Sequence, residues 1–120
     1  KGRDQYAVSC GACHQADGNG LPNMAPTLAK SDWVTGDPNR LIGVAVHGLM
    51  GPIKVNGKEV KDIPPIMPAH GFMNDDQLSS ILTYVRNAWG NRSGTISKED
   101  IADYRKSHSS RLSPWTEKEF

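Results

Sequence analysis

The chain contains two cysteines, which lie three positions apart, and a histidine directly follows the second: Cys10-Gly11-Ala12-Cys13-His14. This spacing is typical of the covalent attachment of a c-type haem. Each thiol can add across one haem vinyl group to form a thioether, because the two cysteines are about one helical turn apart, close to the separation of the vinyl groups. His14 then lies beneath the iron and offers a neutral imidazole nitrogen as an axial ligand. A fold built on this motif has to wrap around a large, flat, apolar group.

Two other interpretations of the cysteine pair are less well supported. A thioredoxin-like redox dithiol is expected near a strand–helix–strand pattern, which this chain lacks. A structural zinc site usually needs four ligands, and the histidines are scattered without the spacing of a metal finger. They are His14, His47, His70 and His108. A disulfide or a zinc site therefore remains the alternative to the haem.

Length and composition fit a small domain that gains stability from a cofactor. The chain has 120 residues, of which 37% are hydrophobic, with 12 glycines and 8 prolines. One domain is expected, and burial of side chains alone stabilises such small domains poorly. The net charge of +1 gives no sign of the strongly basic face that nucleic-acid binding needs.

The sequence shows neither an apolar run of membrane-spanning length nor a signal peptide. Haem is attached to motifs of this kind outside the bacterial cytoplasm. We therefore expect a periplasmic protein whose export signal has been removed, or part of a larger exported protein.

Apolar spacing and capping residues predict helices joined by loops rich in glycine and proline. The strongest helix begins after Asn74 as its N-cap and ends before Gly90. An Asn-Gly pair predicts a small hairpin within residues 54–60. The predicted helices cover residues 2–14, 38–49, 75–89 and 98–106, and residues 116–120 are expected to form a short helical turn.

A low-spin electron carrier needs a second axial ligand, for which a methionine thioether is the usual choice. The candidates are Met24, Met50, Met67 and Met73. We favour Met67 because Pro64, Pro65 and Pro68 flank it, and a stiff loop can hold a sulfur at the iron without a large entropy cost. Met24 lies too near His14 along the chain, whereas Met50, Met73 or a histidine remain alternatives.

Taken together, these motifs resemble those of class I c-type cytochromes, in particular the monohaem domains associated with bacterial periplasmic dehydrogenases and oxidases. The resemblance extends over about residues 2–90. It rests on Gly2 and Tyr6, the Cys10–His14 motif, Pro26-Thr27-Leu28, residues 46–49, Met67-Pro68-Ala69 and residues 81–86. It implies an all-α cytochrome c fold of four to five short helices around one covalent haem c.

The resemblance also implies a role for each matching residue. Cys10 and Cys13 would be the thioether anchors of the haem, and His14 would be the proximal ligand of its iron. Met67 would be the distal ligand. Pro26 occupies the position whose backbone carbonyl accepts the other imidazole N–H of the proximal ligand, which fixes its tautomer.

The terminal helices of the family cross each other, and Gly2, Tyr6 and Tyr84 match that crossing. A small residue at position 2 would allow close approach, and Tyr84 is expected to contribute to cofactor binding. His70 departs from the family, because similar domains often carry an aromatic residue there. Arg40 and Arg86 could pair with a haem propionate, although solvated surface positions are the more ordinary role.

We therefore expect a cytochrome c domain at residues 1–90. Residues 91–120 would form a C-terminal helical extension that packs on this domain or contacts a partner. The expected function is one-electron transfer between redox proteins, with a dehydrogenase as donor and an oxidase or reductase as acceptor. The chain would be a monomer without its own catalytic activity. The alternatives are a cytochrome domain of a larger redox enzyme or, if Met67 does not bind the iron, a haem peroxidase or gas sensor.

Overall fold

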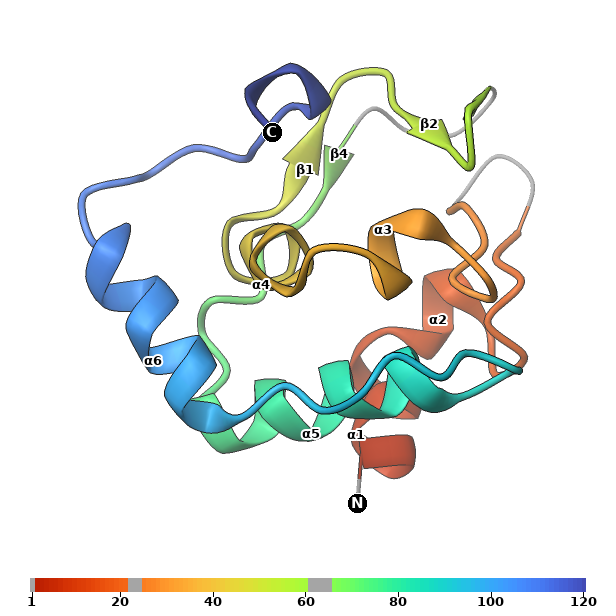
Figure 1. The fold of residues 1–120 in the computed structure, drawn as a ribbon, viewed down its shortest axis with the longest axis horizontal. Coiled ribbons are helices and arrows are strands. Elements are labelled where there is room, and N and C mark those ends of the chain that lie inside the picture. The colour runs from red at the N-terminus through yellow and green to blue at the C-terminus, as the bar shows by residue number, and fades with distance from the viewer. Residues whose placement is uncertain (1, 22–24, 61–65) are drawn as a thin grey trace.

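Short helices surround a central pocket in this computed structural model, which describes residues 2–21, 25–60 and 66–120 (Figure 1). The helices are α1 Gly2–Ser9, α2 Gly11–His14, α3 Asp32–Thr35, α4 Pro38–His47, α5 Asp75–Asn87 and α6 Lys98–Ser107. A 3₁₀ turn follows at Glu117–Glu119. The strands are β1 Leu49–Met50, β2 Lys54–Val55, β3 Lys58–Glu59 and β4 Ile66–Met67. The predicted helical class of the fold is confirmed.

The α5 helix begins where its sequence predicts. The Asn74 side chain accepts the backbone N–H of Gln77 at 2.8 Å, and the Gln77 side chain accepts the backbone N–H of Asn74 at 3.0 Å. This reciprocal pair satisfies N–H groups that a helix start leaves without partners. The helix ends at Asn87, two residues earlier than predicted, because Ala88 adopts an extended conformation, and Trp89 and Gly90 then adopt a positive φ.

The predicted helix over residues 2–14 is divided in two at Cys10, whose φ and ψ are −122° and −28°. The first part, α1, crosses α5 at close range (Figure 1). A Cβ atom at Gly2 would clash with the carbonyl oxygen of Ser80 and would lie 3.0 Å from Cβ of Tyr84. Gly2 therefore allows the two helices to approach through their backbones.

Helix α4 separates two groups of buried side chains and supplies residues to both. Its Asp37 cap accepts the backbone N–H of Asn39, with Pro38 in the first turn. The main core contains Tyr6, Val34, Leu41, Ile42, Ala45, Val46, Met73, Leu78, Ile81, Leu82, Val85, Ile96, Ile101 and Tyr104. A second core contains Trp33, Val44, Leu49, Ile53 and Val55.

The chain leaves α4 at Gly48, whose φ is +88°, and forms β1 where the prediction extends the helix to residue 49. Strand β1 pairs antiparallel with β4, with Leu49 opposite Met67. The predicted hairpin is confirmed by the pairing of β2 with β3, and positive φ values at Asn56 and Gly57 suit its two-residue turn.

Residues 91–120 pack against the preceding part of the chain. Ile96, Ile101 and Tyr104 belong to the main core, and α6 contacts both α5 and α4. The segment after α6 then returns to β1, where Trp115 pairs with Leu49 (Figure 1). Among the described residues, none of the helices combines the length and apolar character needed to cross a membrane.

Candidate functional site

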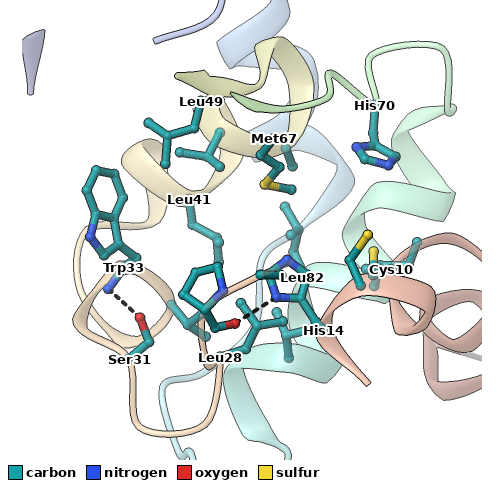
Figure 2. Close-up of a pocket in the computed structure, with 18 of the residues that line it drawn as sticks. Cys10, His14, Leu28, Ser31, Trp33, Leu41, Leu49, Met67, His70 and Leu82 are labelled. Carbon is teal, nitrogen blue, oxygen red and sulfur yellow. Dashed lines mark hydrogen bonds between the residues drawn. The ribbon is translucent and has the colours of Figure 1, made fainter. Parts of the chain in front are cut away.

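A largely apolar pocket opens between α2, α4, α5 and the β1–β4 ribbon (Figure 2). Its volume is about 170 Å³. One water needs about 10–15 Å³ of such space, so the pocket could hold on the order of ten waters. Protein interiors seldom leave an apolar void of this size, because close packing contributes to their stability. The walls therefore fit a large apolar occupant better than they fit solvent.

The wall formed by α2 presents the His14 imidazole, which is 7% exposed. Its Nδ1 lies 3.0 Å from the Pro26 carbonyl oxygen and donates a hydrogen bond to it. Burial lowers the pKa of His14, with a smaller contribution from His70, although the bond to Pro26 acts in the opposite direction. The ring is therefore neutral at pH 7, and Nε2 is the nitrogen whose lone pair could bind a metal.

Backbone contacts hold this imidazole in place. The Gly20 N–H donates to the His14 carbonyl at 2.9 Å. A Cβ at Gly20 would come within 2.6 Å of the Pro26 carbonyl oxygen, and the φ of Gly20 is +73°. The loop after α2 thus folds tightly against the proline that fixes the ring.

Both cysteines line the same pocket as free thiols, with Cys10 half-buried and Cys13 exposed. Burial raises the pKa of the Cys10 thiol to about 11, and the neighbouring Cys13 adds to this increase. A reactive redox dithiol instead has an accessible thiol with a lowered pKa. No group of three His, Cys, Asp or Glu side chains in the described parts of the chain could hold a metal ion.

Met67 lies across the pocket from His14, and Figure 2 shows both side chains directed into it. Strand β4 fixes the Met67 backbone through its pairing with Leu49, which also lines the pocket. Met73 lines the pocket too, but it is buried within the main core. Met50 is 37% exposed and follows Leu49 in β1, so its side chain projects from the opposite face.

The pocket thus brings together Cys10, Cys13, His14, Pro26 and Met67. Tyr84 is absent from the described residues that line it, and its ring packs on Tyr6 and Trp89 with centroid distances of 5.5 Å to each. Tyr6 does line the pocket, so Tyr84 supports it from behind. The expected part of Tyr84 in cofactor binding stays a prediction. Met24, Pro64 and Pro65 lie outside the described residues.

The sequence predicts Cys10, Cys13, His14, Pro26 and Met67 as cofactor-binding residues but leaves most of the apolar walls of the pocket unassigned. These include Leu28, Trp33, Leu41, Leu49, Ile81 and Leu82. The apolar spacing within residues 38–49 and 75–89 marks several of these positions as buried, but the same spacing serves packing and cofactor contact equally well.

Neither of the two candidate propionate partners is among the described residues that line the pocket. The guanidinium of Arg40 stacks over Trp33, 4.3 Å from the ring centroid, and donates to the Asp32 carbonyl. Arg86 is buried, and its guanidinium donates to backbone carbonyls at 3.0 and 3.1 Å. Both arginines therefore hold the fold together around the site.

Comparison with known proteins gives a family match over most of the chain. Residues 1–89 match the family model for cytochrome c. The cytochrome c subunit of gluconate 2-dehydrogenase from Pantoea cypripedii is 33% identical over 109 residues, which cover 88% of this chain and 24% of that protein. The cytochrome c subunit of quinone-type alcohol dehydrogenase from Gluconobacter oxydans (strain 621H) is 32% identical over 109 residues, covering 87% of this chain and 22% of that protein.

Cytochrome c-552 from Thermus thermophilus is 30% identical over 87 residues, which cover 69% of this chain and 64% of that protein. Of the two dehydrogenase subunits, by contrast, the chain spans only about a quarter of the length.

Proposed function

The chain belongs to the cytochrome c family, and from this premise we propose that its pocket holds one haem c between His14 and Met67. Covalent haem c and haem-based electron transfer come with membership of this family, so the chain is an electron carrier or an electron-carrying subunit. When bound, the haem supplies a one-electron couple between ferrous and ferric iron. The protein binds and orients this group and keeps water away from it.

The observation that carries the proposal is the opposed placement of two side chains in one apolar pocket (Figure 2). His14 would bind the iron through Nε2, because Nδ1 is engaged with Pro26. That hydrogen bond raises the basicity of the ligand and keeps its ring from rotating. Met67 would bind from the other side through its thioether, which raises the reduction potential relative to a second imidazole.

The thiols of Cys10 and Cys13 would form the two thioether bonds at the edge of the pocket. Cys13 is exposed and lines the pocket, so the attached edge would reach the protein surface there. Electron exchange would take place at this edge, through a small and transient contact with a partner. If both His14 and Met67 bind the iron, these side chains would occupy the places where a substrate or gas could bind.

We place this electron transfer in the bacterial periplasm, with a dehydrogenase as donor and an oxidase or reductase as acceptor. The names of the relatives support a donor of this kind, since several are cytochrome c subunits of dehydrogenases. The share of those subunits that the chain spans also favours a second form of the proposal, in which this is one cytochrome domain of a larger redox enzyme. The mass of the protein purified from its source, compared with 13.1 kDa plus one haem, separates the two forms.

The Met67→Ala variant tests the distal ligand. We expect it to lose the weak far-red band that marks His/Met ligation of ferric haem, to bind carbon monoxide in the ferrous form and to have a lower reduction potential. Met50→Ala is the control, because its side chain is on the other face of the ribbon. A Met67→Ala protein with the parent spectrum, together with a Met73→Ala protein that loses the band, would refute the assignment.

Extraction of the haem tests the covalent bonds. Acid organic solvent should leave the haem on the parent protein but remove it from the double variant Cys10→Ala, Cys13→Ala. A pyridine haemochrome assay measures the haem in the solvent and the haem that stays on the protein. Haem that leaves the parent protein under these conditions would contradict the thioether assignment.

A further inference from the structure

Strand β1 has neighbours on both of its edges, and only one of them lies within residues 1–89, which match the family model. On one edge it pairs with β4, where Leu49 lies opposite Met67. On the other edge it pairs with Trp115, which comes from the segment after α6 (Figure 1). The Trp115 N–H donates to the Gly48 carbonyl at 3.0 Å, and the Met50 N–H donates to the Trp115 carbonyl at 2.8 Å. Leu49 is therefore held between Met67 and Trp115.

This arrangement matters because the β1–β4 ribbon is too short to be stable by itself. Each strand has two residues, and isolated two-stranded ribbons are marginally stable in water even when they are longer. The Trp115 backbone covers the open edge of β1 at Leu49 and satisfies the Gly48 carbonyl and the Met50 N–H, which would otherwise face solvent. The position of the Met67 backbone thus depends on a residue that is 48 positions away along the chain.

The Trp115 side chain anchors this bridge to the protein interior. Its indole Nε1 donates to the Tyr104 hydroxyl at 2.7 Å. An indole can only donate, so the Tyr104 O–H is available to donate to Nδ1 of His47, also at 2.7 Å. Tyr104 is 5% exposed and belongs to the main core. The anchor therefore runs from Trp115 through a buried phenol to the last residue of α4.

Two further contacts fix the indole ring. The Arg111 guanidinium carbon lies 3.4 Å from the centroid of the Trp115 ring and covers one face of it. The absence of a side chain at Gly43 makes room on α4, since a Cβ there would lie 2.9 Å from the indole nitrogen. These contacts leave the ring little freedom to move away from β1.

We propose that Trp115 is a positioning residue for the distal ligand, which it holds at the haem by fixing β1 and, through β1, the strand that carries Met67. The inference rests on the proposed function, because it requires Met67 to bind the iron. When Trp115 is removed, the ribbon opens more often and Met67 leaves the iron more readily. The fold itself keeps its main core, of which Trp115 is a peripheral neighbour.

Imidazole binding to the ferric protein tests this role, because an added ligand competes with Met67 for the iron. We expect Trp115→Ala to bind imidazole about tenfold more tightly than the parent, which corresponds to about 1.4 kcal/mol. Its far-red band should weaken and its reduction potential should fall. Trp115→Phe keeps an aromatic ring but lacks the indole N–H, so its imidazole affinity should lie between those of the parent and Trp115→Ala. This variant tests the proposal if the alanine variant does not fold.

Trp89→Ala is the matched control. Trp89 is also half-buried and its indole also donates one hydrogen bond, at 2.8 Å to the Ala16 carbonyl, but it packs on Tyr6 and Tyr84 beside α1. Its loss should lower the free energy of unfolding and leave imidazole affinity unchanged. Equal effects of Trp89→Ala and Trp115→Ala on imidazole affinity would overturn the inference, because they would reflect general destabilisation.

The inference would also be overturned if both Trp115 variants bound imidazole with the same affinity as the parent. Failure of the proposed function itself would be recognised from the spectra of the parent protein and of Met67→Ala. In that case the parent protein lacks the far-red band, or Met67→Ala retains it, and the Trp115 inference falls with the ligand assignment.

Discussion

A missing side chain sets the distance between α1 and α5. Gly2 lies where these helices cross, and any Cβ there would meet the Ser80 carbonyl. Backbone atoms cannot yield as the end of a flexible side chain can, so the helices would have to separate. Because Tyr6 on α1 also lines the pocket, the crossing positions one wall of the site.

We predict that Gly2→Ala lowers the free energy of unfolding by about 1–3 kcal/mol, the usual cost of an overpacked contact. Denaturant unfolding followed by circular dichroism measures the change. Gly11→Ala is the matched control in the adjoining helix, because a Cβ there would meet nothing closer than 3.6 Å. It should be neutral or slightly stabilising, since alanine favours helix over glycine. Equal losses in the two variants would show that the crossing is not the cause.

The burial of the Arg86 guanidinium could not be predicted from the sequence around it. An arginine near the end of an amphipathic helix is ordinarily a solvated surface group. Here it is 6% exposed and binds the carbonyls of Val34, Gly36 and Ser93. These acceptors come from segments on both sides of α5 in the sequence. Local pattern carries no information about them, because folding alone brings them together.

At the scale of elements, the longer helices were predictable, whereas the single-turn helix α3 was not, although Ser31 caps it. The capping boxes at Asn74 and at Ser97 locate the starts of α5 and α6. Helix α3 has one turn, from Asp32 to Thr35, and therefore no apolar repeat to detect. The β1–β4 pairing joins residues far apart in the chain, so the extension of α4 to residue 49 was wrong. The Gly48 backbone and the strand partner determine that end.

We predict that Asn74→Ala destabilises the protein by about 1 kcal/mol, because it leaves an N–H of α5 without its acceptor. Asn74→Asp keeps an acceptor at the same place and should stay close to the parent. The midpoint of denaturant unfolding measures both. A parent-like midpoint for Asn74→Ala would mean that α5 is held by its packing and gains little from the cap.

At the scale of the whole molecule, residues 91–120 complete the core. Ile96 and Ile101 are almost fully buried, and Asn91 accepts the Lys30 N–H at 2.7 Å and donates to the Val85 carbonyl at 2.8 Å. The sequence alone is compatible with an extension that packs on the domain and with one that contacts a partner. Its aromatic residues lack helical periodicity, so their destinations could not be deduced from spacing.

The contact between this extension and α4 also affects stability against acid. The pKa of His47 lies below its ordinary value of 6.5, chiefly because of burial and also because of the positive charges of Arg111, His108 and Arg105. A hydrogen bond with the backbone of Arg111 partly opposes these effects. The folded protein thus favours neutral His47. The contribution of neutral His47 to the free energy of unfolding is fully present above pH 6.5 and is lost as the pH falls through the lowered pKa.

We therefore predict that the free energy of unfolding of the haem-loaded protein falls between pH 7 and pH 5, and that His47→Gln makes the fall shallower. The difference in slope should be well below the about 1.4 kcal/mol per pH unit of one full proton, because water screens this partly exposed ring. Denaturant unfolding at a series of pH values measures the slopes. Identical slopes for the parent and His47→Gln would show that His47 does not contribute to the loss of stability at low pH.

The place of Leu49 between Met67 and Trp115 has a consequence for biogenesis. Cys10 and Cys13, the proposed thioether anchors, precede Trp115 by about 100 residues, and contacts between residues so far apart in the chain form later than local helical turns. After export, the thiols would thus be ready for ligation to porphyrin before the backbone at Trp115 has joined β1. Maturation would then proceed in two stages, with the pigment attached first and its final coordination secured last.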